Sequence, residues 1–560
     1  MRRLSIFTRT SLLAGVALAL PTLLACLDHP LKPVKYEAAS EKGGTIQLTV
    51  NKDVDILFVI DNSGSMGEEQ GLLSGNFPAF INVLEDPEVK ANYRIGVTTT
   101  DNGNPWCGTT SPEAGKLQMS SCLGRTGEFV FNGNPPADAT AAACTDLCQF
   151  DTISTTPTST EFDPDEKPRP WLENIEGKTN LAEVGGMTPS TIEAFQCFGP
   201  QGIAGCGFES HLESMYKAFL RAQKEAEAQY GFLRSNAILS VVIITDEVDC
   251  SYNNEHQSIF LPESMGGDPT VFWSDPTASA PTSAVCWRAG VACEGGPGTY
   301  DTCHSENKDS AGNNGASDND AVLHPIGRYI DFVQQLEDQK QTITPDQEVL
   351  VALITGVPPG YDAGQAEISY ADATSATEQN DFGIGAGCVN NATTPPATAR
   401  PPVREREFAE AFQVGTEDAD RNLYSICTDD FSPALGDIAD AIRDQIKPAC
   451  MPACVADNDL VANGLQPSCT LEQEAPKPSG GGVDTTVIQP CNADETLPGD
   501  EDVCYVSLVD ASLSDYCADL GWNLEFRLVR REGVPAPGGT SVSATCQLSQ
   551  NKDMDCPGLP

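Results

Sequence analysis

Residues 54–65 read VDILFVIDNSGS, and the expected fold class follows from them. The first seven residues are mostly apolar, with branched and aromatic side chains, which is typical of a strand buried on both faces of a sheet. The run stops at Asp61, after which Ser63 and Ser65 alternate with Asn and Gly. Apolar residues at three- and four-residue steps across 73–84 then predict an amphipathic helix. The stretch therefore predicts a strand, a polar turn and a helix, with side-chain oxygens gathered at the turn.

Further strand patterns along the chain extend this unit. The apolar runs at 237–244 and 349–354 have the composition of buried strands, and 93–100 and 423–427 are further strand candidates. Amphipathic helical patterns lie between and after these strands. Apolar strands that alternate with such helices predict an α/β domain with a doubly wound, mostly parallel sheet that is covered on both faces.

The length of the chain and the distribution of its turn residues predict several parts. A chain of 560 residues is too long for one simple core. We expect the α/β domain over residues 51–447 and a small, cysteine-rich β domain over 448–560. Three stretches of the first domain are rich in Gly, Pro, Asn, Asp and Thr and are predicted to be long surface insertions, namely 102–190, 252–320 and 357–402.

The N-terminus has the features of an export signal. Residues 1–25 combine a basic start with an apolar stretch that is too short to span a bilayer comfortably. The segment ends at Cys26 and resembles a bacterial lipobox, in which the peptidase cuts before the Cys and the Cys is acylated. We therefore expect a lipoprotein with a signal peptide over 1–25, lipidation at Cys26 and a tether over 26–50. The alternative is an ordinary secretory peptide with an incidental Cys.

The expected location follows from the same segment. A lipid anchor on an exported chain predicts the bacterial cell envelope, and Leu27 after the acylated Cys is no obvious signal for retention in the inner membrane. We therefore expect a lipid-anchored protein of the outer membrane.

The cysteine count agrees with export. The chain has 21 Cys, and removing Cys26 leaves an even number. Exported chains with so many thiols hold them as disulfides. Two CxxxC pairs offer zinc as an alternative, but only five His are present and the compartment oxidises thiols, so disulfides are favoured; the pairs are Cys144 with Cys148 and Cys450 with Cys454.

The net charge of −47 excludes one class of partner. A chain this acidic repels the phosphate backbone, so nucleic acid is not an expected partner.

A group of side-chain oxygens is predicted at one edge of the sheet. Asp61, Ser63 and Ser65 follow the first strand, and Asp246 follows the strand at 237–244. In a doubly wound sheet the ligand crevice lies at the carboxyl ends of the strands, where the winding direction reverses. Hard oxygen ligands of this kind suit Mg²⁺, Ca²⁺ or Mn²⁺ rather than zinc. The four side chains therefore predict a divalent-cation site.

These segments resemble a known family. Residues 55–66, DILFVIDNSGSM, are similar to the opening strand and metal-ion-dependent adhesion site of von Willebrand factor type A domains, and residues 243–247, IITDE, are similar to the later strand with the second aspartate. The resemblance covers roughly 54–447 in separated blocks. It implies that both serines bind the metal directly, that the aspartates act directly or through water, and that an acidic side chain of a protein partner fills the open position.

The chain departs from that family at the third loop. The resemblance implies a threonine ligand there, yet residues 199–212 contain no Thr. Glu209 is the candidate that would supply an oxygen and an extra negative charge. A bridge between Cys197 and Cys206 would reshape this loop. A different explanation of the whole site is that Asp61, Ser63 and Ser65 only cap the following helix.

The expected function is binding rather than catalysis. A hydrolase would need a base beside Ser63, and nothing in the sequence places His211 or His256 there. We expect a cell-envelope lipoprotein that binds a protein partner through the cation, in adhesion or in assembly of an envelope complex. The alternative is a structural surface lipoprotein with a degenerate metal site, which binds through its insertions.

Overall fold

The computed structural model describes most of the chain from residue 45 to residue 558. The expected signal peptide, Cys26 and most of the expected tether lie outside the described residues, as do short gaps at 49–50, 88, 134–135, 345–346, 394–395, 416–420, 447, 460, 463, 478–482, 533, 535 and 537–539. Within the part of the chain that the structure describes, no helix is long and apolar enough to cross a bilayer.

Seven strands form the main sheet, in the order β15-β11-β8-β2-β3-β6-β7. Five of them are parallel: β2 (Asp53–Ile60), β3 (Asn92–Thr99), β8 (Ile238–Ile244), β11 (Leu350–Thr355) and β15 (Leu423–Ser425). Two short strands add antiparallel to one edge: β6 (Leu172–Ile175) and β7 (Lys178–Thr179). The prediction of a mostly parallel sheet in an α/β fold is therefore confirmed.

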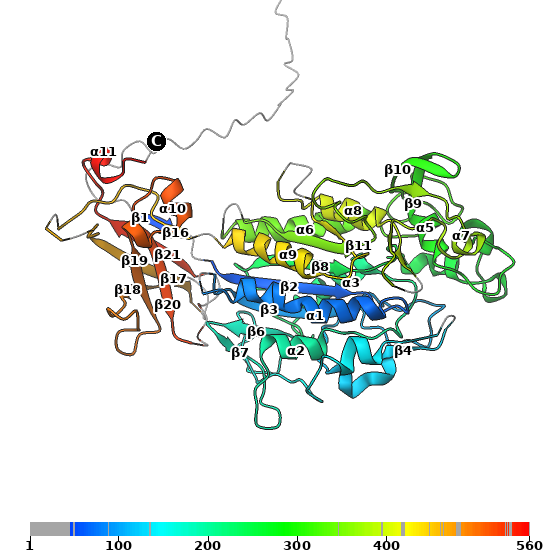
Figure 1. Ribbon diagram of the computed structural model, residues 1–560, viewed down its shortest axis with the longest axis horizontal. Helices are drawn as coiled ribbons and strands as arrows, with labels where there is room; N and C mark the ends of the chain where they lie inside the picture. The colour runs from blue at the N-terminus through cyan, green and yellow to red at the C-terminus, as the bar shows by residue number, and fades with distance from the viewer. Residues whose placement is uncertain are drawn as a thin grey trace, which may run out of the picture.

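Helices cover both faces of this sheet, as Figure 1 shows. The side chains of β2 alternate between two cores, with Phe58 in one and Leu57 and Val59 in the other. The first core packs against α1 (Gly67–Leu84), α2 (Thr191–Phe198) and α9 (Ser432–Gln445). The second packs against α3 (His211–Ala222), α6 (Ile326–Gln341) and α8 (Val403–Glu410). Burial of β2 on both faces explains why its sequence is an almost continuous apolar run.

The predicted insertions carry the short elements of the fold. The first holds η1 (Cys122–Phe129), β4 (Val130–Phe131), β5 (Ala137–Asp138) and η2 (Ala141–Thr145). The second holds η3 (Asn254–Phe260), η4 (Glu263–Met265), α4 (Pro269–Phe272), α5 (Ala284–Gly290), β9 (Val291–Gly295) and β10 (Thr299–Ser305). The third holds β12 (Tyr370–Ala371), α7 (Ala376–Phe382), β13 (Cys388–Asn390) and β14 (Ala397–Ala399). Figure 1 shows α5, α7, β9 and β10 gathered at one end of the molecule.

The prediction that residues 102–190 are a surface insertion is wrong for β6 and β7, which belong to the main sheet. Strand β6 reads LENI and has no apolar periodicity, yet all four of its residues are buried. The buried carboxylate of Glu173 is tolerated because Arg94 on the neighbouring strand pairs with it at 3.0 Å. Ion pairing, which hydropathy does not reveal, therefore holds this edge of the sheet.

A second sheet lies at the other end of the molecule, in the order β1-β21-β17-β18-β19-β20-β16 (Figure 1). Its strands are β1 (Thr45–Leu48), β16 (Ala449–Cys450), β17 (Cys469–Pro476), β18 (Val483–Pro490), β19 (Val503–Leu508), β20 (Glu525–Arg530) and β21 (Ser541–Cys546), with the short helices η5 (Asp510–Ser512), α10 (Asp515–Asp519) and α11 (Lys552–Asp555) beside them. Residues 45–48 were expected in the tether, but they pair with β21 because Leu48 joins the core of this sheet.

Ten disulfides join the twenty cysteines that follow Cys26, as predicted. The pairs are Cys107–Cys206, Cys122–Cys144, Cys148–Cys197, Cys250–Cys286, Cys293–Cys303, Cys388–Cys427, Cys450–Cys517, Cys454–Cys556, Cys469–Cys546 and Cys491–Cys504. Neither CxxxC pair is left free for zinc. The bridge considered between Cys197 and Cys206 does not form, because Cys197 pairs with Cys148 and Cys206 with Cys107. So many disulfides indicate an exported protein.

Candidate metal centre

The candidate site lies where β2 and β8 end, side by side in the main sheet. Ile60 stands opposite Ile244, and the amide of Asp61 donates to the carbonyl of Ile244 at 3.0 Å. From β2 the chain continues to β3 on one side, and from β8 to β11 on the other. The two strands therefore flank the switch point of the sheet, where the winding direction reverses and ligands bind.

The structure brings together the four side chains that the sequence predicts. The hydroxyl oxygens of Ser63 and Ser65 are 3.2 Å apart, and the Ser65 hydroxyl donates to Asp246 Oδ1 at 3.1 Å. Asp61 lies beside them, and its Oδ2 accepts a hydrogen bond from the hydroxyl of Thr245 at 2.7 Å. Residues separated by some 180 positions thus present hydroxyl and carboxylate oxygens to one small region.

The helix-capping explanation of these residues does not hold for α1. The N-cap residue of α1 is Met66, whose side chain makes no capping hydrogen bond, so none of Asp61, Ser63 and Ser65 is the cap residue. Asp61 Oδ1 accepts instead from the amide of Ser63 at 2.8 Å, which closes the turn between strand and helix. Both serine hydroxyls therefore face the site rather than the helix terminus.

Glu209 and Glu247 add two carboxyl groups to this region. Glu209 is only 1% exposed, and the side chain of Glu247 interacts directly with it. Among the described residues, Glu209 Oε1 and Glu247 Oε2 are buried without a hydrogen-bond partner. Burial and then the charge of Glu247 raise the pKa of Glu209 well above its usual range. Burial and then Asp61 raise the pKa of Asp246 in the same way, and that of Glu247 to about 7.

Two disulfides fix the loop that carries Glu209. Cys206 is joined to Cys107, and its amide donates to Asp101 Oδ2 at 3.2 Å. Cys250 is joined to Cys286, and its amide donates to the carbonyl of Glu209 at 2.6 Å. In the sequence, Glu209 was a candidate only because it lies in the loop where the resemblance implies a threonine, and these bonds show how it is held at the site.

Gly205 allows this loop to approach β2 closely. Its amide donates to the carbonyl of Asn62 at 2.8 Å, and a Cβ at this position would overlap the Asn62 side chain. A larger residue at 205 would therefore require the Asn62 side chain to move.

His211 lies behind Asp61 and is fully buried. Its Nε2 is 3.9 Å from Asp61 Oδ2, and its Nδ1 is 3.5 Å from Glu405 Oε1 and 3.8 Å from Asp249 Oδ1. Burial lowers the pKa of His211, but the neighbouring carboxyl groups of Asp61, Glu405 and Asp249 outweigh burial, and the pKa is raised. Within the described residues no hydrogen bond joins His211 to Ser63; its ring contacts the aspartate instead.

The insertions form the rim of the site. Ser65 is exposed, whereas Ser63, Asp61 and Asp246 are buried, so the site opens at Ser65. The ring of Phe131, from the first insertion, lies so close that a Cβ on Gly64 would be 3.0 Å from it. The amide of Arg400, at the end of the third insertion, donates to the carbonyl of Asp246 at 2.7 Å.

The donor set fits a hard divalent cation. Among the described residues, no group of three or more His, Cys, Asp or Glu side chains is arranged to hold a metal ion. An ion bound between Asp61 and Asp246 would have to use the serine hydroxyls as well. Hydroxyl and carboxylate oxygens favour Mg²⁺, Ca²⁺ or Mn²⁺, and the buried oxygens without a donor leave valence for a cation to fill.

Several residues of the site were not predicted. Thr245 and Glu247 flank Asp246 in the segment used for the family resemblance, but neither was assigned a role. Glu69 is nearly buried, and burial, followed by Glu68 and Asp61, raises its pKa to about 7. The only sequence signal for Glu69 is its place in the first helical turn after the serines, where an acidic residue is ordinary.

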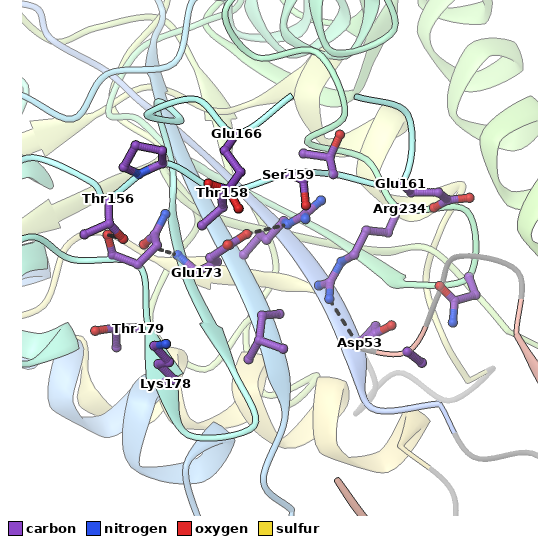
Figure 2. Close-up of a pocket in the computed structure, with 17 residues that line it drawn as sticks. Asp53, Thr156, Thr158, Ser159, Glu161, Glu166, Glu173, Lys178, Thr179 and Arg234 are labelled. Atoms are coloured by element: carbon purple, nitrogen blue, oxygen red, sulfur yellow. Dashed lines mark hydrogen bonds and ion pairs between the residues drawn. The ribbon is translucent and has the colours of Figure 1, made fainter. Parts of the chain in front are cut away.

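A separate cavity of about 470 Å³ lies near the start of β2, away from the candidate site. Figure 2 shows Arg234 pointing toward Asp53 in this cavity, and their charged atoms are 3.1 Å apart. Arg94 and Glu173, which also line it, pair at 3.0 Å. Its arginines are already bound to carboxylates of the protein.

Comparisons with known proteins leave the family open. No protein-family model matches the chain, and no curated protein matches it. Solved structures that resemble it include the pilus adhesin SpaC from Lactobacillus rhamnosus GG, at a TM-score of 0.27 and 10% identity over 92% of this chain and 43% of that one. The open conformation of SpaC gives 0.25 and 9% over 91% and 41%. The pilus adhesin RrgA from Streptococcus pneumoniae gives 0.24 and 11% over 91% and 58%. The chain thus spans about half the length of these adhesins, and TM-scores this low assign no fold.

Proposed function

We propose that this protein is an exported, lipid-anchored protein of the bacterial cell envelope whose α/β domain is of the von Willebrand factor A type. In this proposal Asp61, Ser63, Ser65 and Asp246 hold one Mg²⁺, Ca²⁺ or Mn²⁺ ion, and Glu209 lies beside them. Cys26 would carry the lipid and place the domain at the outer membrane.

The observation that carries the proposal is the meeting of two distant segments at the switch point. Ser65 donates to Asp246 across 181 positions, and Ser63 lies 3.2 Å from Ser65. Since the N-cap residue of α1 is Met66, helix capping by either serine does not account for the position of these hydroxyls. A cation would supply the positive charge that the group lacks.

The bound ion would serve recognition. Ser65 is exposed, so an ion held there can accept a further oxygen from another protein. An acidic side chain is the expected partner group, in adhesion or in assembly of an envelope complex. We propose binding rather than catalysis, since Ser63 contacts Ser65 and His211 contacts Asp61, an arrangement without a nucleophile and a base in hydrogen-bond reach.

Isothermal calorimetry of the full-length protein with Mg²⁺, Ca²⁺ and Mn²⁺ tests the proposal. We expect a saturable heat with at least one ion, lost in Asp61→Ala and in Ser63→Ala. Ser190→Ala is the matched control, because that hydroxyl caps α2 and its loss should leave the heat unchanged. No heat in well-folded protein would contradict the proposal and favour a structural protein that binds through its insertions. Capture of envelope proteins with and without chelator then identifies the partner.

A further inference from the structure

Strand β18 leaves most of one edge unpaired. On one side, residues 483–488 pair with β17 at six consecutive positions. On the other side, β19 pairs with β18 only at Gln489 and Pro490, and no other strand among the described residues lies along this edge. Residues 483–487 are all exposed. The backbone N–H and C=O groups on the free side of these residues are therefore open to pairing with a further strand.

The edge lacks the features that usually prevent strands from joining. The outermost strands of the two seven-stranded sheets are short, with four residues in β1, three in β15 and two each in β7 and β16. Natural sheets protect longer edges with Lys, Pro or a β-bulge. Residues 483–488 contain no Lys or Pro, and their register with β17 is continuous. A long edge without such protection indicates a surface that another strand covers.

The sequence of the edge fits a second copy of itself. Residues 483–487 read VDTTV, which is nearly symmetric about Thr485. Two copies related by a two-fold axis at Thr485 would pair antiparallel, with Val483 of each copy opposite Val487 of the other. The two valines are 49% and 46% exposed and lie on the same face of the strand, because they are four positions apart. The pairing would therefore cover exposed apolar side chains of both copies.

The distribution of charge also favours this edge as a contact between copies. The net charge of −47 makes two copies repel each other in general. Within 483–488 the only charged residue is Asp484, and Lys477 of the same chain lies 3.4 Å from it. Glu472 and Glu474 lie on the next strand, β17. They would be at least three strand spacings, about 14 Å, from the same residues of the other copy, beyond the screening length of about 8 Å at physiological ionic strength.

We propose that this protein forms a two-fold dimer in which the free edge of β18 pairs antiparallel with β18 of a second copy around Thr485. The proposal does not depend on the cation site. β1 ends at Leu48 and β2 begins at Asp53, so the second sheet adjoins the amino end of β2 (Figure 1). Pairing through β18 therefore leaves the carboxyl ends of the main sheet uncovered. A dimer would carry two candidate sites and bind a multivalent surface with higher avidity than one copy.

Cysteine cross-linking of the full-length protein tests the proposed register. Residues directly opposite each other have Cα atoms about 4.5–5.5 Å apart, which is within reach of a disulfide. Thr485→Cys should therefore give a covalent dimer under mild oxidation, and a mixture of Val483→Cys and Val487→Cys should give a mixed dimer. Val487→Cys alone should give none, because its two copies would be about 14 Å apart. Val461→Cys is the matched control, since this position is exposed and lies outside β18.

Sedimentation velocity in chelator measures the dimer without the cation. Wild type should show a reversible monomer–dimer equilibrium with a micromolar dissociation constant, because so short a strand pair buries less than a standard interface. Val487→Lys should raise this constant by at least about tenfold, since Lys on an edge strand disfavours pairing, whereas Val461→Lys should leave it unchanged.

The outcomes are independent of cation binding. A protein that stays monomeric and gives no covalent dimer from Thr485→Cys overturns the proposal and leaves the edge to a strand of a different protein. A dimer that is unaffected by Val487→Lys, or that is cross-linked through Val487→Cys alone, also overturns it. Calorimetry on the same samples decides the cation site separately, so either proposal can fail while the other stands.

Discussion

The parallel strands of the main sheet have buried carboxylates at both their amino and their carboxyl ends, but the two ends differ in how the negative charge is compensated. At the start of β2, Arg234 pairs with Asp53 at 3.1 Å, as Figure 2 shows. Arg234 also pairs with Asp55 at 2.8 Å, and Arg94 pairs with Glu173 at 3.0 Å. At the carboxyl end, no arginine among the described residues forms an ion pair with Asp246, Glu209 or Glu247, although the charge of Arg400 lowers the pKa of Glu247. A buried carboxylate is stable only when a positive charge or several donors compensate it. The first end is therefore complete as folded, and the second is suited to take its positive charge from outside.

The largest expected effect on stability comes from removing an arginine at the amino ends of the strands, where the buried carboxylates are paired. Arg234→Ala leaves Asp55 fully buried without its partner, which should lower the free energy of unfolding by about 3–5 kcal/mol. Urea denaturation measures the loss, and adding divalent cations should not restore it. In Arg234→Ala with Asp55→Asn, part of the stability should return. An unchanged midpoint in the single variant would mean that the ion pair contributes nothing.

The next effect concerns the loop that carries Glu209. Replacing Cys107 and Cys206 together by Ser removes a bridge that spans 99 positions, and we expect a loss of about 2–4 kcal/mol of stability. Cation affinity should fall as well, because Cys206 orients the segment that leads to Glu209. Replacing Cys491 and Cys504 in the second sheet is the control, since it should leave cation affinity unchanged. Equal cation affinity in both double variants would show that the bridge does not position the site.

Replacing one carboxylate by its amide should change the free energy of unfolding in opposite directions at the carboxyl and the amino ends of the strands. Burial, followed by Asp61, raises the pKa of Glu247 to about 7, so the charged form is unfavourable in the cation-free protein. Glu247→Gln should therefore stabilise that protein by about 1–3 kcal/mol at pH 8. Glu173→Gln should destabilise it, because Arg94 would lose its partner. Thermal unfolding in chelator measures both; the same sign for the two variants would remove the contrast between the ends.

The smallest expected effect is a pH dependence of the free energy of unfolding, caused by Lys340 near the amino ends of the strands. Lys340 is buried and donates to the carbonyls of Arg234 and Ala237, and burial lowers its pKa to about 8. Because the unfolded chain binds this proton more tightly, the burial penalty is present below pH 8 and declines as pH rises toward 10.5. Relative to Lys340→Met, wild type should therefore gain about 1–3 kcal/mol of stability between pH 8 and 10.5. Denaturation midpoints across that range test this, and a parallel pH profile for the two proteins would contradict it.

The parts that sequence reasoning predicted are those in which a residue type and its environment agree. β2, β8 and β11 are buried on both faces, so their apolar runs located them within a residue or two. Asp61, Ser63, Ser65 and Asp246 were found because parallel strands bring their carboxyl ends to one edge. The cation itself and the family remain predictions.

The parts that were missed depend on partners distant in the chain. β6 reads as polar because Glu173 is paired by Arg94, and β1 forms only because β21 follows some 500 positions later. Glu247 gave no separate signal beside Asp246, and the buried position of His211 follows from packing under Asp61. The disulfide pairs could not be derived, since twenty cysteines allow very many pairings.

A crystal structure of the full-length protein with Mn²⁺, phased to locate anomalous scatterers, tests the central claim most directly. We predict a manganese peak within about 2.0–2.6 Å of the Ser63 and Ser65 hydroxyl oxygens, in direct or water-mediated contact with Asp61 and Asp246. A well-ordered site at saturating Mn²⁺ with only water between these residues, or a peak bound elsewhere on the sheet, would contradict it.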